Sequence, residues 1–209
     1  MNEFERALGI TLGKAALKRL QEVRIGIAGA GGLGSNCAQL LVRSGFKKFK
    51  IVDFDTVDQG NLNRQFYFVR QVGAKKVEAL RENLLLINPD LELEVLDEKI
   101  TAGLAGELFA DCQAVVEALD GPGQKRMVVE AYMNSGRLLV AASGLAGWGR
   151  SDDIRVHRVT DNFYIVGDLV SEVSAETPAL AAGVAIAAAK QADIVFSYFL
   201  GQRGRGYDG

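Results

Sequence analysis

Hydrophobic positions along this chain follow two alternating patterns. Short apolar runs predict buried strands, and apolar residues spaced three and four apart between them predict helices. Strands that alternate with helices pair in parallel through right-handed crossovers. The sequence therefore predicts an α/β, Rossmann-like domain whose mainly parallel sheet carries helices on both faces. The predicted strands are 23–28, 49–54, 91–96, 114–119 and 138–142, and the predicted helices are 11–22, 35–43, 74–87, 104–109 and 124–134.

The pattern changes in the last third of the chain. Two apolar segments at 154–159 and 163–166 have the spacing of a β-hairpin, which predicts a C-terminal antiparallel extension of the sheet. An alanine-rich segment at 178–200 predicts a long helix. Because no repeat or linker interrupts the pattern, we expect a single domain over 1–209, with a helical segment at 1–22 and a flexible glycine-rich tail at 201–209.

Composition excludes several classes of protein. The 209 residues are 48% hydrophobic and carry a net charge of −2, so the chain has no basic field for nucleic acid. The apolar stretch 178–189 is too short to span a membrane, and the first residues lack the features of a secretory signal. Cys37 and Cys112 stand far apart, so we expect no cysteine zinc site and a reduced, cytoplasmic protein.

A glycine loop follows the first predicted strand and opens the next helix. Gly29, Gly31 and Gly34 form a GxGxxG motif, within which Gly32 is a further glycine. Glycines let the backbone approach a phosphate, and the N–H groups of the helix start hold its charge. Asp53, at the end of the second strand, is placed to accept hydrogen bonds from a ribose. The motif predicts an adenine nucleotide but leaves NAD and ATP both open.

Polar residues after the second strand favour ATP. Asn61, Arg64, Gln65 and Lys76 supply amide, guanidinium and ammonium donors that a triphosphate needs. Taken singly, Arg64 and Lys76 are equally typical of solvated helix charges. Asp120 ends the fourth strand, and ligands of open parallel sheets bind at the carboxyl ends of strands. We therefore expect Asp53 and Asp120 to face one crevice, Asp53 for ribose and Asp120 for Mg²⁺.

These stretches resemble the ubiquitin-activating-type adenylyltransferases, which include the ThiF and MoeB proteins. The matching segments are IAGAGGLGSN, IVDFDTVDQGNLNRQF, GAKKVEALRENLLLINP and VVEALD, and AASGLAGWG and NFYIVGD resemble a short zinc-free branch linked to thiamine biosynthesis. The chain departs from the family at Gly121, where Asn is common. The resemblance implies that the glycine loop contacts phosphate, that Asn61, Arg64, Gln65 and Lys76 surround the triphosphate, and that Asp120 binds Mg²⁺.

The same resemblance implies an activity and partners. It implies ATP-dependent adenylation of the Gly-Gly carboxylate of a ubiquitin-fold sulfur carrier, by a homodimer in which Arg6 reaches the partner's site; Arg6 is otherwise a solvated helix residue. The apolar residues of 74–87 and the cluster 66–68 favour a dimer or simply fill the core. Two rival functions stay open: an NAD-dependent oxidoreductase, supported by the glycine motif and Asp53, and a non-catalytic nucleotide-binding subunit.

Two further expectations concern the carrier. The glycine-rich loop 143–149 follows the fifth strand, where its small residues either leave room for the carrier's tail or form an ordinary turn. No cysteine lies between Gln113 and Gly209. We therefore expect the acyl-adenylate to pass to a separate sulfur donor without a covalent bond between carrier and enzyme.

Overall fold

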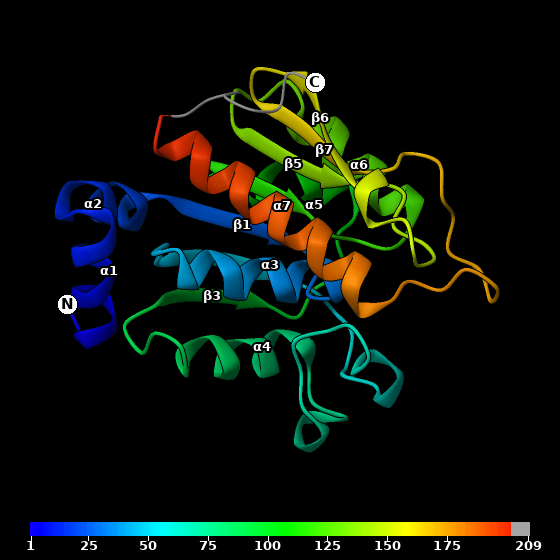
Figure 1. The fold of residues 1–209 in the computed structure, drawn as a ribbon, viewed down its shortest axis with the longest axis horizontal. Helices are drawn as coiled ribbons and strands as arrows, with labels where there is room; N and C mark the ends of the chain where they lie inside the picture. Colours follow the sequence, from blue (N-terminus) through cyan, green and yellow to red (C-terminus); the bar gives the residue numbers. More distant parts are fainter. Residues whose placement is uncertain (202–209) are drawn as a thin grey trace.

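The computed structural model describes residues 1–201, which form one seven-stranded sheet with helices packed on it (Figure 1). Residues 202–209 of the expected tail lie outside the described residues. The strands are β1 (Arg24–Ala28), β2 (Lys48–Val52), β3 (Glu92–Leu96), β4 (Ala114–Glu117), β5 (Leu138–Ala142), β6 (Arg155–Thr160) and β7 (Phe163–Gly167). The helices are α1 (Glu3–Leu12), α2 (Lys14–Glu22), α3 (Gly32–Arg43), α4 (Lys76–Leu85), α5 (Ala102–Leu108), α6 (Pro122–Tyr132) and α7 (Ala181–Phe199), with 3₁₀ turns at Gln59–Asn61, Val69–Gln71 and Ser151–Asp153.

The sheet has the order β3-β2-β1-β4-β5-β7-β6. Every pair is parallel except β6 with β7, which are antiparallel. The prediction of a Rossmann-like, mainly parallel sheet with an antiparallel extension is therefore confirmed. The chain reverses its direction of travel across the sheet between β1 and β4, and this switch point opens a crevice at the carboxyl ends of the two strands.

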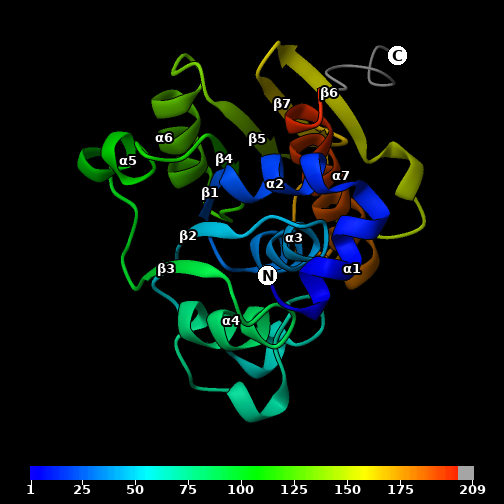
Figure 2. The ribbon, with the colours of Figure 1, turned by 90° about the vertical axis from the view of Figure 1, so that its left-hand side faces the viewer.

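Helices cover both faces of the sheet, as the sequence predicts (Figure 2). On one face, α3, α4 and α7 bury alternate strand residues such as Ile25 and Ile27. On the other face, α5 and α6 pack on a second apolar cluster that includes Val115 and Phe109. Gly26 permits this second packing, because a Cβ there would lie 2.4 Å from the Phe109 ring.

The predicted helix at 11–22 is wrong in its extent. The structure has two helices there, and Gly13 separates them with a φ of 84° that a continuing helix does not allow. The first helix begins at Glu3 because the Asn2 side chain accepts a hydrogen bond from the Glu5 N–H at 2.9 Å. No helix among residues 1–201 is long and apolar enough to cross a membrane.

Candidate active site

The glycine loop joins β1 to α3 in a turn that only glycine allows at two positions. Gly29 has a φ of 100°, and a Cβ on Gly34 would lie 1.8 Å from the Gly29 carbonyl oxygen. In contrast, a Cβ on Gly31 would meet only Gln65, at 3.9 Å, and Gly31 borders a cavity. Two glycines therefore make the turn, and a third leaves space beside the N-terminus of α3, where backbone N–H groups attract a phosphate.

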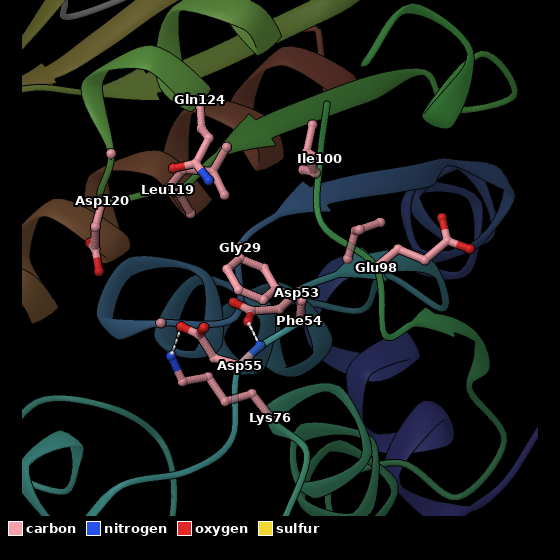
Figure 3. Close-up of a pocket in the computed structure, with 14 residues that line it drawn as sticks. Gly29, Asp53, Phe54, Asp55, Lys76, Glu98, Ile100, Leu119, Asp120 and Gln124 are labelled. Carbon is pink, nitrogen blue, oxygen red and sulfur yellow. Dashed lines mark hydrogen bonds and ion pairs between the residues drawn. The ribbon is translucent and has the colours of Figure 1, made fainter. Parts of the chain in front are cut away.

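A cavity of about 120 Å³ lies at the carboxyl ends of β1, β2 and β4 (Figure 3). Asp53 forms one side of it and braces the glycine loop, because its carboxylate accepts hydrogen bonds from the Ala30 N–H at 2.6 Å and the Asp55 N–H at 2.8 Å. A carboxylate has about four acceptor positions, so Asp53 retains capacity for a sugar hydroxyl. The cavity is lined by Gly29, Gly31, Val52, Asp53, Phe54, Asp55, Lys76, Glu98, Ile100, Ala118, Leu119, Asp120, Gly121 and Gln124.

Lys76 enters the same cavity as a nearly buried cation. Its Nζ lies 2.8 Å from an oxygen of Asp55, and its backbone N–H donates to the Asp55 carbonyl at 2.9 Å. The Asp55 contact fixes the direction of the ammonium group, which has further protons for a ligand. Asp55 therefore holds Lys76 in place.

The residues between β2 and α4 separate into two groups. Arg64 borders a second cavity and, among residues 1–201, donates only to neutral partners, the Gly60 carbonyl at 3.2 Å and the Asn63 amide oxygen at 2.8 Å. Asn61 accepts a hydrogen bond from the Asp58 N–H at 3.0 Å and thereby closes a turn. Gln65 is buried, and its Oε1 atom has no hydrogen-bond partner among the described residues. Neither Asn61 nor Gln65 lines either cavity.

The second cavity, of about 490 Å³, adjoins the first. Leu119 and Asp120 line both cavities, so Asp120 stands where they meet. Its side chain is exposed, and no residue of the part that the structure describes pairs with its carboxylate. The second cavity is lined by Gly32, Leu33, Arg64, Leu119, Asp120, Pro122, Lys125, Ala142, Ser143, Gly144, Leu145, Ser171, Glu172, Val173, Ala179 and Val184.

The chemistry around Asp120 fits Mg²⁺ that is held jointly with a substrate. Within the described residues, no group of three or more acidic, histidine or cysteine side chains is placed to hold a metal ion by itself. Mg²⁺ is usually held by one or two carboxylates together with substrate phosphates rather than by an all-protein cage. A free carboxylate at the mouth of a cavity with a glycine loop meets that requirement.

Arg6 lies far from this crevice in its own chain. Arg6 lies on α1, which together with α2 packs near the amino end of β1, whereas the glycine loop follows the carboxyl end of that strand (Figure 1). Arg6 contacts Glu3 at 3.8 Å and borders a separate cavity between α1 and α2. The structure thus brings together the glycine loop, Asp53, Lys76, Arg64 and Asp120, but not Arg6.

Sequence reasoning missed several residues of the crevice. Phe54 and Gln124 line the first cavity, and Lys125 lines the second. Each of them follows the carboxyl end of a strand or lies in the first turn of the next helix. That position is a signal for a crevice residue in an open parallel sheet.

A family model described as the ThiF family matches residues 4–202. The chain belongs to the ThiF family. Among the relatives of this ThiF-family chain, ubiquitin-like modifier-activating enzyme 5 of Caenorhabditis elegans is 42% identical over 84 residues, 40% of this chain and 20% of that protein. The adenylyltransferase and sulfurtransferase UBA4 of Eremothecium gossypii is 30% identical over 156 residues, 72% of this chain and 35% of that protein. The ThiF-family chain thus matches about a third or less of the length of these relatives.

Solved structures share the fold over almost the whole chain. The tRNA N6-threonylcarbamoyladenosine dehydratase TcdA of E. coli, in complex with AMP, matches with a TM-score of 0.85 and 21% identity over 94% of each chain. The same protein in complex with ATP matches with a TM-score of 0.84 and 20% identity, over 96% of this chain and 95% of that one. At this identity the likeness of the ThiF-family chain to TcdA is one of fold.

Proposed function

We propose that this ThiF-family chain uses ATP to adenylate the terminal carboxylate of a ubiquitin-fold sulfur carrier that ends in Gly-Gly. The observation that carries the proposal is the free carboxylate of Asp120 at the junction of two cavities. One cavity suits a nucleotide and the other an extended acceptor. Membership of the ThiF family and the similarity to an adenylyltransferase and sulfurtransferase support this assignment.

The nucleotide half uses the first cavity. In the proposal, Asp53 binds the ribose, and the backbone around Gly31 contacts phosphate. Lys76, in the first cavity, and Arg64, in the second, offset the charge of the triphosphate. Asn61 and Gln65 join them if the loop that carries them turns toward the phosphates. TcdA, which shares the fold, has been solved in complex with AMP and with ATP, and this supports an adenine nucleotide as the ligand.

The acceptor half uses the second cavity. Ser143, Gly144 and Leu145 form part of its rim, at the end of β5. Gly144 has a φ of 77°, and a Cβ there would lie 2.0 Å from a carboxylate oxygen of Asp168, so this rim stays free of bulky groups. Trp148 is 69% exposed beside it. In the proposal, the extended Gly-Gly tail of the carrier enters over this loop.

The reaction follows from the two halves. The carrier's terminal carboxylate oxygen attacks the α-phosphorus of ATP, a mixed anhydride bond forms, and the bond to the bridging oxygen of pyrophosphate breaks. Charge grows on the pyrophosphate as it leaves, and fixed cations stabilise such charge without reorganisation. Arg64 and Lys76 do this here. Asp120, with the phosphates, would hold Mg²⁺, which supplies further positive charge when it is bound.

We also propose a cytoplasmic homodimer that uses Mg²⁺ and no zinc, and a carrier of thiamine biosynthesis. Arg6 reaches a nucleotide only if a second copy presents it. Phe68 and Val69 are 48% and 70% exposed, which supports an apolar contact, whereas Tyr67 is buried in the monomer, where its hydroxyl donates to the Ala30 carbonyl at 2.7 Å. Sedimentation that shows a fully active monomer would contradict the dimer.

Carrier-dependent exchange of radioactive pyrophosphate into ATP tests the activity. We expect exchange with the thiamine sulfur carrier and none with the same carrier lacking its terminal Gly-Gly. Carriers of molybdopterin synthesis serve as a comparison for specificity. Titration with ATP and Mg²⁺ against NAD separates the proposal from a dehydrogenase. Binding of NAD without ATP, or exchange that ignores the carrier's tail, would contradict it.

A further inference from the structure

An ion pair between a buried carboxylate and a partly exposed lysine lies next to the turn that carries Asp120. Glu117 is the last residue of β4, and its side chain is 1% exposed. Lys125, in the first half of α6, places its Nζ 3.1 and 3.0 Å from the two carboxylate oxygens of Glu117. The remaining surface of Lys125 borders the second cavity. Neither residue has a role in the reaction described above.

The Glu117 side chain holds the turn that carries Asp120 from one side, and the backbone of α6 holds it from the other. Glu117 Oε1 accepts a hydrogen bond from the Leu119 N–H at 2.7 Å, just before Asp120. The backbone N–H of Lys125 donates to the Gly121 carbonyl at 2.9 Å, just after it. Asp120 itself has no partner within the described residues, so the position of its carboxylate depends on these neighbours.

The same pair extends to the other walls of the crevice. Lys125 Nζ donates to the Ala142 carbonyl at 3.0 Å, at the end of β5 beside the rim residue Ser143. From α7, the Gln191 side chain donates to the Glu117 carbonyl at 3.1 Å. The end of β4, the start of α6, the end of β5 and the middle of α7 are therefore joined at one point.

Stability alone does not explain an ion pair at this depth. Burial raises the pKa of Glu117 above its ordinary value, and the charge and hydrogen bonds of Lys125 oppose that rise. Because desolvation of two charges offsets much of their attraction, an apolar pair of similar size often stabilises a protein equally well. What an apolar pair does not reproduce is the set of directed contacts to Leu119 and Ala142.

We propose that Glu117 and Lys125 are positioning residues that hold Asp120 at the junction of the two cavities and fix its position relative to the rim of the acceptor cavity. This inference rests on the proposed function for the identity of the reaction. A displaced Asp120 carboxylate would weaken the binding of metal together with ATP before any carrier binds. The affinity for metal therefore tests the positioning role independently of the carrier.

The test compares Lys125→Met, Lys125→Arg and Arg126→Ala. Arg126 is the matched control, since it lies on the same helix in an ion pair with Glu130 at 2.6 Å but is 79% exposed. Binding of Mn²⁺ is followed by electron paramagnetic resonance in the presence of ATP, and ATP affinity is measured without metal. Loss of a residue that supports a metal ligand costs about 10- to 100-fold in metal affinity or activity. We expect a loss of that size in Mn²⁺ affinity and in kcat for Lys125→Met.

The other readouts separate positioning from a general loss of structure. We expect Lys125→Arg to recover most of the Mn²⁺ affinity, Arg126→Ala to match the wild type, and metal-free ATP affinity to stay unchanged throughout. If Lys125→Met does not fold, Glu117→Gln replaces it, because it keeps an acceptor for the Leu119 N–H and removes the charge that holds Lys125. Unchanged Mn²⁺ affinity and kcat in a folded variant would overturn the inference. A wild type that binds Mn²⁺ and ATP but adenylates no carrier would instead contradict the proposed function.

Discussion

Charged side chains at the two ends of the parallel sheet differ in whether they have charged partners. Near the amino ends of the strands, Arg24 contacts Glu94 and Asp111, and Lys50 contacts the same two acids at 3.5 and 2.8 Å. At the carboxyl ends, the Asp120 carboxylate has no partner among residues 1–201, and Arg64 donates only to neutral groups. The first end pairs its charges internally, whereas the second, besides the pairs Lys76–Asp55 and Lys125–Glu117, leaves Asp120 and Arg64 without a charged partner among the described residues. Substitutions at the two ends should therefore affect different properties.

The largest effect is expected at the carboxyl end. Asp120→Asn should lower carrier-dependent pyrophosphate exchange by about 10²–10³-fold, because the carboxylate that would hold Mg²⁺ beside the reacting phosphates is lost. The free energy of unfolding should change by less than about 0.5 kcal/mol, since the side chain is exposed and unpaired. Exchange assays and urea unfolding of the same preparation measure both. Near-normal exchange in Asp120→Asn, or a large loss of stability, would contradict the expected difference between the two ends.

The reverse outcome is expected at the amino end. Lys50→Met should lower the free energy of unfolding by about 1 kcal/mol, because it leaves Asp111 and Glu94 with Arg24 alone. The affinity for ATP should not change, since Lys50 lines neither cavity of the crevice. Urea midpoints and ATP titration test the two statements, with Lys48→Met, whose Nζ lies 3.9 Å from Glu92, as a control at the protein surface. A weaker affinity for ATP would show that the ends are coupled.

A smaller effect, confined to acid, is expected at Glu5 on α1. Burial alone would raise the pKa of this carboxyl, but hydrogen bonds from Lys47 and Asn88 and the charge of Lys47 bring it below its ordinary value of 4.5. The lowered pKa contributes stability that is complete above pH 4.5 and is lost as the pH falls through the folded-state pKa. Glu5→Gln should therefore flatten the dependence of stability on pH in that acid window. Thermal unfolding at several pH values checks it, and an unchanged slope would contradict it.

The smallest effect is expected from the two cysteines. Burial raises the pKa of the Cys37 thiol and raises that of Cys112 to about 12, so neither supplies the thiolate that covalent transfer requires. The folded double variant with Cys37→Ala and Cys112→Ser should keep adenylation and sulfur transfer. Non-reducing electrophoresis with the carrier provides the measurement. A reductant-sensitive adduct in the wild type that disappears in the double variant would refute it.

Local patterns in the sequence predicted the fold and the centre of the site. Alternating strands and helices imply the parallel sheet, and the rule that ligands bind at strand carboxyl ends is enough to bring Asp53 and Asp120 to one crevice. The glycine loop could be placed because it joins a recognisable strand to a recognisable helix. The limit is visible at Gly13, where helical spacing continues through a residue whose φ of 84° ends one helix and starts another.

Side-chain partners could not be predicted in the same way. Lys76 pairs with Asp55 and Lys125 with Glu117 only because the tertiary fold brings separate elements together. Residue type also did not reveal that the side-chain amide oxygen of Asn61 already accepts a hydrogen bond from the Asp58 backbone N–H. Spacing identifies which residues come near a crevice, whereas the direction of each side chain depends on contacts made elsewhere in the fold.

The position of α7 has a consequence for the order in which the protein matures on the ribosome. This helix packs along α3, and its Val184 side chain lies 3.0 Å from where a Cβ on Gly32 would be, while Gln191 reaches the carbonyl of Glu117. The glycine loop and the Asp120 turn are both synthesised well before residues 181–199. In a nascent chain the apolar side of α3 that packs against α7 is therefore exposed. The crevice is complete only when α7 has left the exit tunnel. Translation pauses upstream of α7 should make the nascent chain sensitive to protease and dependent on chaperones.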